Sequence, residues 1–61
     1  MTQYHYKFLL KGEGNIYVSC LTRYASLERA MRSLEQYITR GQRGELLTRD
    51  ENNNIIEKLE F

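Results

Sequence analysis

The stretch ASLERAMRSLEQYITR, residues 25–40, decides the fold, because it is the one segment with clear helical periodicity. At 100° per residue, its apolar side chains fall in one arc about 120° wide. These are Leu27, Ala30, Met31, Leu34, Tyr37 and Ile38. Ser26 is expected to cap the start of the helix through its hydroxyl, and Gly41 is the matching stop signal. We therefore predict one helix with one side on a core.

Two segments before this helix have the alternating pattern of half-buried strands. Residues 4–11 (YHYKFLLK) place Tyr4, Tyr6, Phe8 and Leu10 on one face. Residues 16–22 (IYVSCLT) place Ile16, Val18 and Cys20 on one face and Tyr17, Ser19 and Leu21 on the other. Turn-forming residues 12–15 (GEGN) separate them, which predicts an antiparallel hairpin.

Two further strands are predicted after the helix, at residues 45–49 and 55–61, around the polar turn 50–54 (DENNN). The order is ββαββ, an α+β domain over residues 1–61 with one helix on one face of a mostly antiparallel four-stranded sheet. Two strand orders satisfy the pattern. In a β-grasp, the first and fourth strands pair in parallel at the centre. In a meander, the third strand adds beside the first or the second.

Two families resemble the chain in shape. In length and element order it resembles the immunoglobulin-binding domains of streptococcal protein G, including Gly44-Glu45 before the second hairpin. Residues 6–38 also resemble the small antitoxins of HicB-type toxin–antitoxin pairs, through Gly14, Tyr17-Val18 and the Leu27-Glu28…Ala30 helix start. The chain lacks the Pro-Asp-x-Pro-Gly-Cys-like segment of those antitoxins. Both resemblances concern layout, so neither implies a function.

The composition argues against several classes of protein. Cys20 is the only cysteine, so an internal disulfide is impossible, and a zinc ligand set is lacking. No apolar run approaches membrane-spanning length, and no signal-peptide core is visible. His5 is the only histidine and has no nucleophile motif beside it. These features favour a cytoplasmic, non-catalytic protein with no cofactor, no metal and no membrane partner.

Two surfaces are candidates for binding. The sheet face turned away from the helix is predicted to carry His5, Lys7, Leu9, Tyr17, Leu21 and Ile56. Apolar residues on an open sheet need a cover, which a larger protein or a second copy in a homodimer would supply. The outer face of the helix carries forked donors suited to phosphates of nucleic acid or to other anions. Its residues are Arg29, Arg32, Gln36, Arg40 and the nearby Arg43.

The leading hypothesis is a small protein-binding module that inhibits, regulates or adapts a larger protein, as small proteins encoded by phages and mobile elements do. It rests on a chain with few catalytic motifs and a surface rich in Tyr and Arg, residues that are enriched in interface hot spots. The alternative is a nucleic-acid-binding protein that uses the helical arginines.

Overall fold

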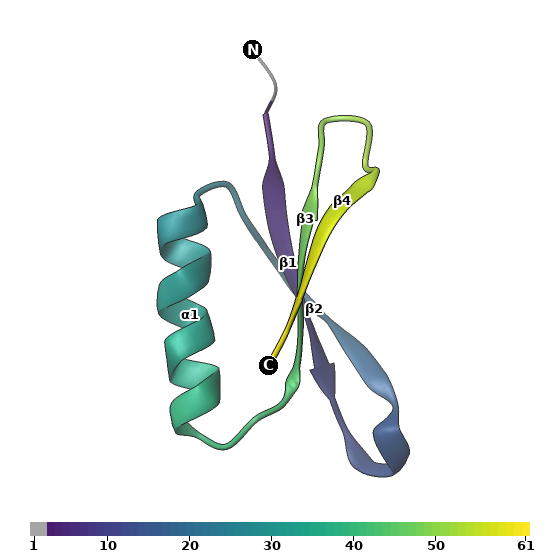
Figure 1. Ribbon diagram of the computed structural model, residues 1–61, viewed down its shortest axis with the longest axis vertical. Helices are drawn as coiled ribbons and strands as arrows, with labels where there is room; N and C mark the ends of the chain where they lie inside the picture. Colours follow the sequence, from purple (N-terminus) through teal and green to yellow (C-terminus); the bar gives the residue numbers. More distant parts are fainter. Residues whose placement is uncertain (1–2) are drawn as a thin grey trace.

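The computed structural model describes residues 3–61, which form one helix and four strands in the predicted order (Figure 1). The elements are β1 (His5–Lys11), β2 (Tyr17–Tyr24), α1 (Leu27–Thr39), β3 (Gly44–Arg49) and β4 (Ile55–Glu60). A short 3-10 helix, η1 (Glu13–Asn15), lies in the turn between β1 and β2. Within these residues, no helix has the length and apolar character needed to cross a membrane. The predicted ββαββ fold of the α+β class is confirmed.

The four strands form one antiparallel sheet in the order β2-β1-β3-β4. The β-grasp alternative is wrong, because β1 pairs with β2 and β3 and not with β4. The third strand adds beside the first, as the other alternative predicted. Because β2 and β3 are both antiparallel to β1, they run parallel to each other. Helix α1 is the crossover connection that carries the chain past β1.

Helix α1 begins and ends within one residue of the boundaries that the sequence indicates. The Ser26 carbonyl accepts the first helical hydrogen bond from the Ala30 N–H at 3.1 Å, but the Ser26 hydroxyl makes no capping bond. The prediction of a hydroxyl cap is therefore wrong. At the other end, Gly41 has a φ of +79°, which glycine adopts without strain. The Gln42 N–H donates to the Tyr37 carbonyl at 2.9 Å, which completes a Schellman cap.

The core lies between α1 and the inner face of the sheet, around Phe8 in β1. Ala30 and Leu34 of α1 and Leu46 of β3 are buried with it. Three aromatic rings meet the Phe8 ring edge-on, with centroid distances of 5.7 Å for Tyr24, 5.0 Å for Tyr37 and 5.9 Å for Phe61. The quadrupoles of aromatic rings favour this arrangement over face-to-face stacking. The predicted inward face of β1 is thus confirmed at Phe8.

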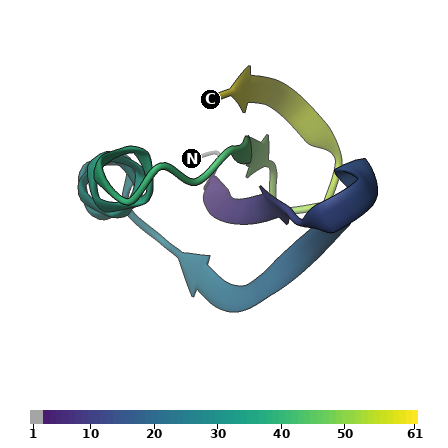
Figure 2. The same ribbon diagram turned by 90° about the horizontal axis from the view of Figure 1, so that it is seen from below.

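Helix α1 covers only part of the sheet, because it packs on β1 and β2. In the view of Figure 2, the helix lies to one side of the sheet, and β4 begins on the far side and curves over the sheet toward the C-terminus. Neighbouring strands lie about 4.8 Å apart, so four strands span roughly 14 Å, whereas a helix is about 10 Å across. A crossover helix between β2 and β3 therefore leaves the inner face of β4 open, since β4 lies beyond β3.

A bulge interrupts the pairing of β2 with β1. Lys7 pairs with Arg23 and Leu9 pairs with Ser19, so residues 20–22 together lie opposite Phe8. The alternation predicted for residues 16–22 therefore holds only as far as the bulge. Leu21 lies within the bulge and is 97% exposed.

Candidate functional site

An apolar groove lies between α1 and β4, over the part of the sheet that the helix leaves open. One end of it is a pocket of about 200 Å³ with four apolar residues among its six lining residues. The lining residues are Leu27 and Met31 of α1, Leu46 and Thr48 of β3, and Glu57 and Leu59 of β4. We call this surface the α1–β4 groove. The name also includes Ile38, near the end of α1, and Phe61, directly after β4.

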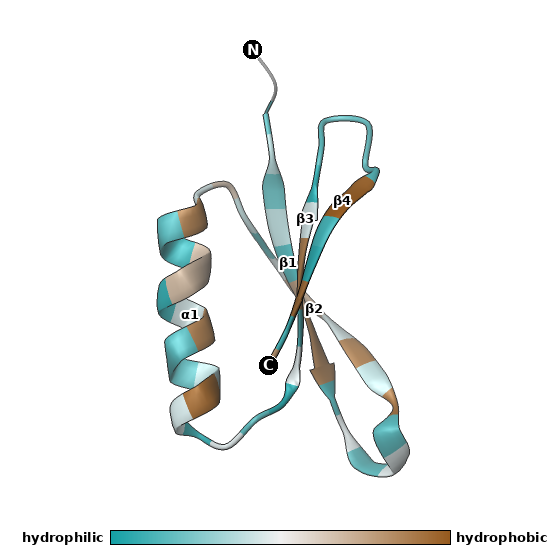
Figure 3. Cartoon of the chain, in the orientation of Figure 1, coloured by the Kyte–Doolittle hydropathy of each residue, from teal (hydrophilic) through white to brown (hydrophobic). Residues whose placement is uncertain are grey.

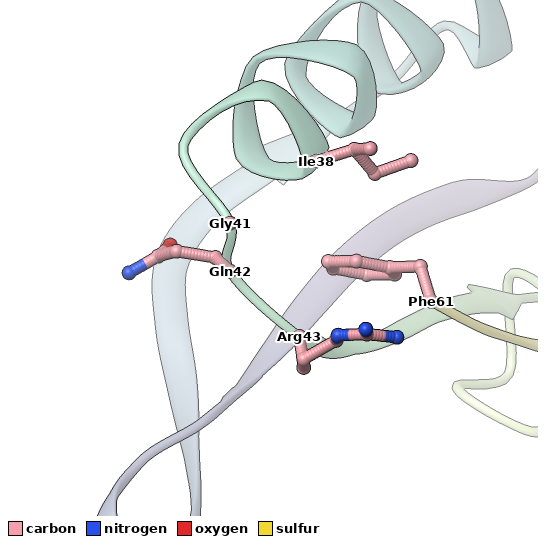
Figure 4. A pocket seen from close by; sticks show the side chains of 5 residues that line it. All are labelled: Ile38, Gly41, Gln42, Arg43 and Phe61. Carbon is pink, nitrogen blue, oxygen red and sulfur yellow. The ribbon is translucent and has the colours of Figure 1, made fainter.

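A second pocket, of about 340 Å³, lies beside the C-terminal end of α1, where Ile38, Gly41, Gln42, Arg43 and Phe61 line it. Figure 4 shows the Phe61 ring between the side chains of Ile38 and Arg43. Ile38 follows Met31 by seven residues, or about two helical turns, so both side chains lie on the same side of α1. The two pockets therefore lie along the same side of the helix, one near each of its ends.

The apolar arc of α1 is divided between the core and this groove. The sequence predicted that all six members of the arc face the core. Three of them do, since Ala30 and Leu34 are buried and Tyr37 is half-buried. The other three, Leu27, Met31 and Ile38, lie on the β4 side and stay exposed, from 40% for Met31 to 54% for Ile38. The prediction that they are core residues is wrong, because α1 packs mainly on β1 and β2 and leaves the side facing β4 open.

The sequence does contain a signal for this exposed row. Leu27, Met31 and Ile38 follow one another at intervals of four and seven residues. These intervals place the three side chains on one side of the helix, as a strip along its axis. Among residues 3–61, α1 is the only α-helix, so no second α-helix of the described chain occupies the groove.

One acidic side chain lines the groove, since Glu57 contributes to the pocket from β4. Glu35, one helical turn after Met31, instead lines a separate hollow with Arg32, Gln36, Thr39 and Arg40. Within residues 3–61, neither of these carboxylates lies in an ion pair. Glu28, at the start of α1, is already paired with Arg32 at 3.1 Å. The groove therefore combines an apolar lining with one carboxylate, that of Glu57, and one guanidinium, that of Arg43.

The six residues predicted for the outer sheet face are only partly brought together. The strand register places His5, Lys7, Leu9 and Tyr17 on the face away from α1. Leu21 lies apart in the bulge, and Ile56 lies on β4, with β3 between it and β1. The first three are half-buried and Tyr17 is exposed.

The centre of this outer face is covered by charged side chains of the sheet itself. Its central apolar residue, Leu47, lies directly opposite Lys7 and Lys58 on the two neighbouring strands and is only 2% exposed. Lysine stems cover apolar neighbours while their charged ends stay in water. The Lys58 ammonium lies 3.5 Å from Glu45, which holds one of these stems in place. The face therefore carries its own cover of charged side chains.

The predicted basic surface of α1 is exposed, but it is smaller than the sequence indicated. Arg29, Arg32, Gln36 and Arg40 share the helix side away from the sheet. The charge of Arg32 is offset by Glu28. Arg43 lies in the loop after the helix, beside Phe61, and belongs to the wall of the groove.

A polar contact joins α1 to β2 inside the packed region. The Cys20 sulfur lies 4.0 Å from the Tyr37 hydroxyl, and Cys20 is half-buried against the core. Burial, and then this contact, raises the pKa of Tyr37. In the part of the chain that the structure describes, no three His, Cys, Asp or Glu side chains gather at a metal site.

No protein-family model matches this chain, and comparisons with curated proteins and with solved structures find no significant match. The function must therefore be inferred from the surfaces of the molecule itself. Among these surfaces, the α1–β4 groove combines concave shape, exposed apolar side chains and unpaired charge.

Proposed function

We propose that this protein is a non-catalytic binding module that inhibits, regulates or adapts a larger protein by holding one of its segments in the α1–β4 groove. The observation that carries the proposal is the exposed row Leu27, Met31 and Ile38, which lies beside the uncovered inner face of β4. Apolar side chains gathered in a concave surface are unfavourable in water, and a bound partner removes them from it.

The segment that fits this groove best is an amphipathic helix. Leu27, Met31 and Ile38 lie on one side of α1 and form a strip along its axis, on which a second helix can lie lengthwise. A helix in this position would also contact Leu59 on the inner face of β4. The hydropathy colouring in Figure 3 shows apolar segments on the helix and on β4. A helix bound here would lie on the apolar part of both elements.

The charge of Glu57 specifies one flank of that helix. Glu57 lies in no ion pair within residues 3–61, so a partner that brings Lys or Arg beside it gains an ion pair on binding. We therefore expect the bound segment to have one apolar stripe and a basic residue beside Glu57.

A pull-down from native lysate tests this function. The tagged protein is incubated with nuclease-treated lysate, and bound proteins are identified by mass spectrometry. The double variant Met31→Gln, Leu59→Gln is expected to lose the partner, because it places uncharged polar groups in the groove without changing the net charge. The matched control Tyr17→Ser, Leu21→Ser alters two exposed residues on the other side of the molecule and should keep it. Loss with the control and retention with the groove variant would contradict the proposal.

Nucleic-acid binding by the helical arginines is the alternative proposal. It is supported by the exposed row Arg29, Arg32, Gln36 and Arg40, and it is weakened by the acidic partner of Arg32. Its distinguishing sign is salt dependence, because each phosphate contact to duplex DNA contributes about 0.9 to the log–log slope of affinity against salt. A protein that stays bound after nuclease treatment, at low and at moderate salt, would favour binding in the groove over this alternative.

A further inference from the structure

We propose that the edge of β2 pairs with β2 of a second copy of this chain, so that the two sheets become one continuous antiparallel sheet. β2 is an edge strand, hydrogen-bonded to β1 on one side only. Val18, within β2, is 61% exposed, and Ile16, just before the strand, is 67% exposed. This inference concerns a different edge of the molecule from the α1–β4 groove and stands or falls separately.

The residues at this edge lack the usual protection against strand pairing. Edge strands of natural proteins are commonly blocked by charged side chains or by proline. The segment Ile16–Cys20 contains neither. The bulge at residues 20–22 disturbs the extended backbone after Ser19, so it prevents pairing with another strand only in the second half of β2. An uncharged, extended stretch of five residues therefore remains open to another strand.

The hydrogen bonds of the β1–β2 hairpin show which backbone groups face this edge. The Gly12 N–H donates to the Ile16 carbonyl at 2.7 Å, so Ile16 points its backbone groups toward β1. Because these groups alternate along an antiparallel strand, Val18 also points toward β1. Tyr17 and Ser19 point their N–H and C=O groups away from β1, toward the free edge.

These free groups fix one symmetric register. If Val18 lies opposite Val18 of the second copy, Tyr17 lies opposite Ser19 in both halves of the pair. Each such pair exchanges two hydrogen bonds, so four backbone groups of each chain are satisfied. The same register places Ile16 opposite Cys20. No charged side chain is brought against another, and the two Val18 side chains meet at the symmetry axis.

The other edge of the sheet does not fit a second copy in this way. The symmetric registers that overlap most of β4 (Ile55–Glu60) are centred on Glu57 or on Lys58. Each of them places two like charges directly opposite one another, which destabilises a strand pair. The choice between the two edges is therefore decided by charge, and it favours β2.

The second copy can approach because the β1–β2 hairpin projects away from α1 (Figure 1). In the symmetric pair, opposite residues share a face, so both helices lie on the same side of the joined sheet. Each β4 lies at an outer edge, at the greatest distance from the axis. The pair then carries two α1–β4 grooves, both open.

Disulfide trapping tests the register. Cys20→Ser serves as the background, and Val18→Cys or Ser19→Cys is added to it. The Val18→Cys chain should cross-link to a covalent dimer with diamide, because residues in a non-hydrogen-bonded pair come closest. The Ser19→Cys chain should not, since its thiol lies opposite Tyr17. Equal cross-linking of the two, or none from Val18→Cys, would overturn the register.

Sedimentation equilibrium tests the association itself. The unmodified chain should move from monomer to dimer as its concentration rises through the micromolar range. Val18→Lys should remain monomeric throughout, because it places two ammonium groups at the axis, while Ile56→Lys on β4 should dimerise like the parent. Circular dichroism checks that both variants keep the helix. The dimer proposal would be overturned if the parent chain stayed monomeric, or if Val18→Lys and Ile56→Lys reduced dimerisation equally. Neither result would bear on the proposed function of the α1–β4 groove.

Discussion

The Ser33 hydroxyl of α1 donates a 2.8 Å hydrogen bond to the Tyr24 hydroxyl at the end of β2. Tyr24 in turn packs edge-on against Phe8, with 5.7 Å between the ring centroids. This chain of contacts anchors the helix on the β2 side of the sheet. The anchored side is the one opposite β4, so the same contact leaves the α1–β4 groove open.

We predict that Ser33→Ala lowers the free energy of unfolding by about 1 kcal/mol, the usual value of one side-chain hydrogen bond. Tyr24→Phe should lower it by a similar amount, since it removes the other partner. The double variant should cost little more than either single change, because both remove the same bond. Urea denaturation of the four proteins measures this coupling, and strictly additive losses would show that the bond contributes nothing.

Gly44 is the glycine whose replacement should be most damaging. A Cβ at this position would collide with the carbonyl oxygen of Leu9 on the neighbouring strand. Gly44→Ala should therefore lower the free energy of unfolding by roughly 1–3 kcal/mol or prevent folding. Gly12→Ala is the control, since its Cβ would lie 3.4 Å from the Ile16 carbonyl oxygen. Thermal unfolding that ranks the two in the reverse order would contradict this packing.

Acidification should weaken the β3–β4 turn through Asp50. Its Oδ1 accepts the N–H groups of Asn52 and Asn54, both at 2.9 Å, and the bond from the Asn54 backbone is the main cause that lowers the pKa of Asp50. A lowered folded-state pKa gives stability that is present above the unfolded pKa of about 4 and is lost as the pH falls through the folded value.

Asp50→Asn should therefore flatten the decline in stability below about pH 4, because an amide oxygen accepts the same bonds without titrating. Urea midpoints measured from neutral to acidic pH record the effect. Glu51→Gln, next in the same turn, is the matched control and should leave the decline as it is in the parent. An unchanged decline in Asp50→Asn would show that other carboxylates account for it.

Removal of the helical arginines should not affect the partner in the groove. Arg29→Gln, Arg32→Gln, Arg40→Gln changes the exposed face of α1 opposite the sheet and spares every residue that lines the groove. The triple variant is expected to retain the same protein from nuclease-treated lysate, at low and at moderate salt. A partner lost with this variant would favour the nucleic-acid or anion-binding alternative.

Local patterns in the sequence were sufficient to predict the elements of this fold. The alternation around Phe8, the helical arc and the positions of Gly41 and Asp50 all correspond to features of the structure. The strand order was not predictable in the same way, because pairing of β3 with β1 depends on contacts between distant parts of the chain. The bulge at Leu21 was missed because it leaves the period-two pattern of its strand intact in the sequence.

The candidate site was harder to predict than the fold. Leu27 and Met31 have the periodicity of core residues, and only the position of β4 beyond β3 leaves them exposed. Leu47 presents the opposite case, since it lies on the outer face and is nevertheless buried between lysines. In both cases the exposure of the side chain depends on which strands are neighbours in the sheet. The periodicity along one strand or helix gives no information about that order.

Site-specific photo-cross-linking gives the most direct test of the α1–β4 groove. A benzophenone side chain is placed at Met31 in one protein and at Gln36, on the opposite side of the same helix, in another, and both are irradiated in nuclease-treated lysate. We predict that Met31 captures one protein, through an amphipathic segment that mass spectrometry can map, and that Gln36 does not capture it. Capture of that protein from Gln36 and not from Met31 would contradict the groove as the binding surface.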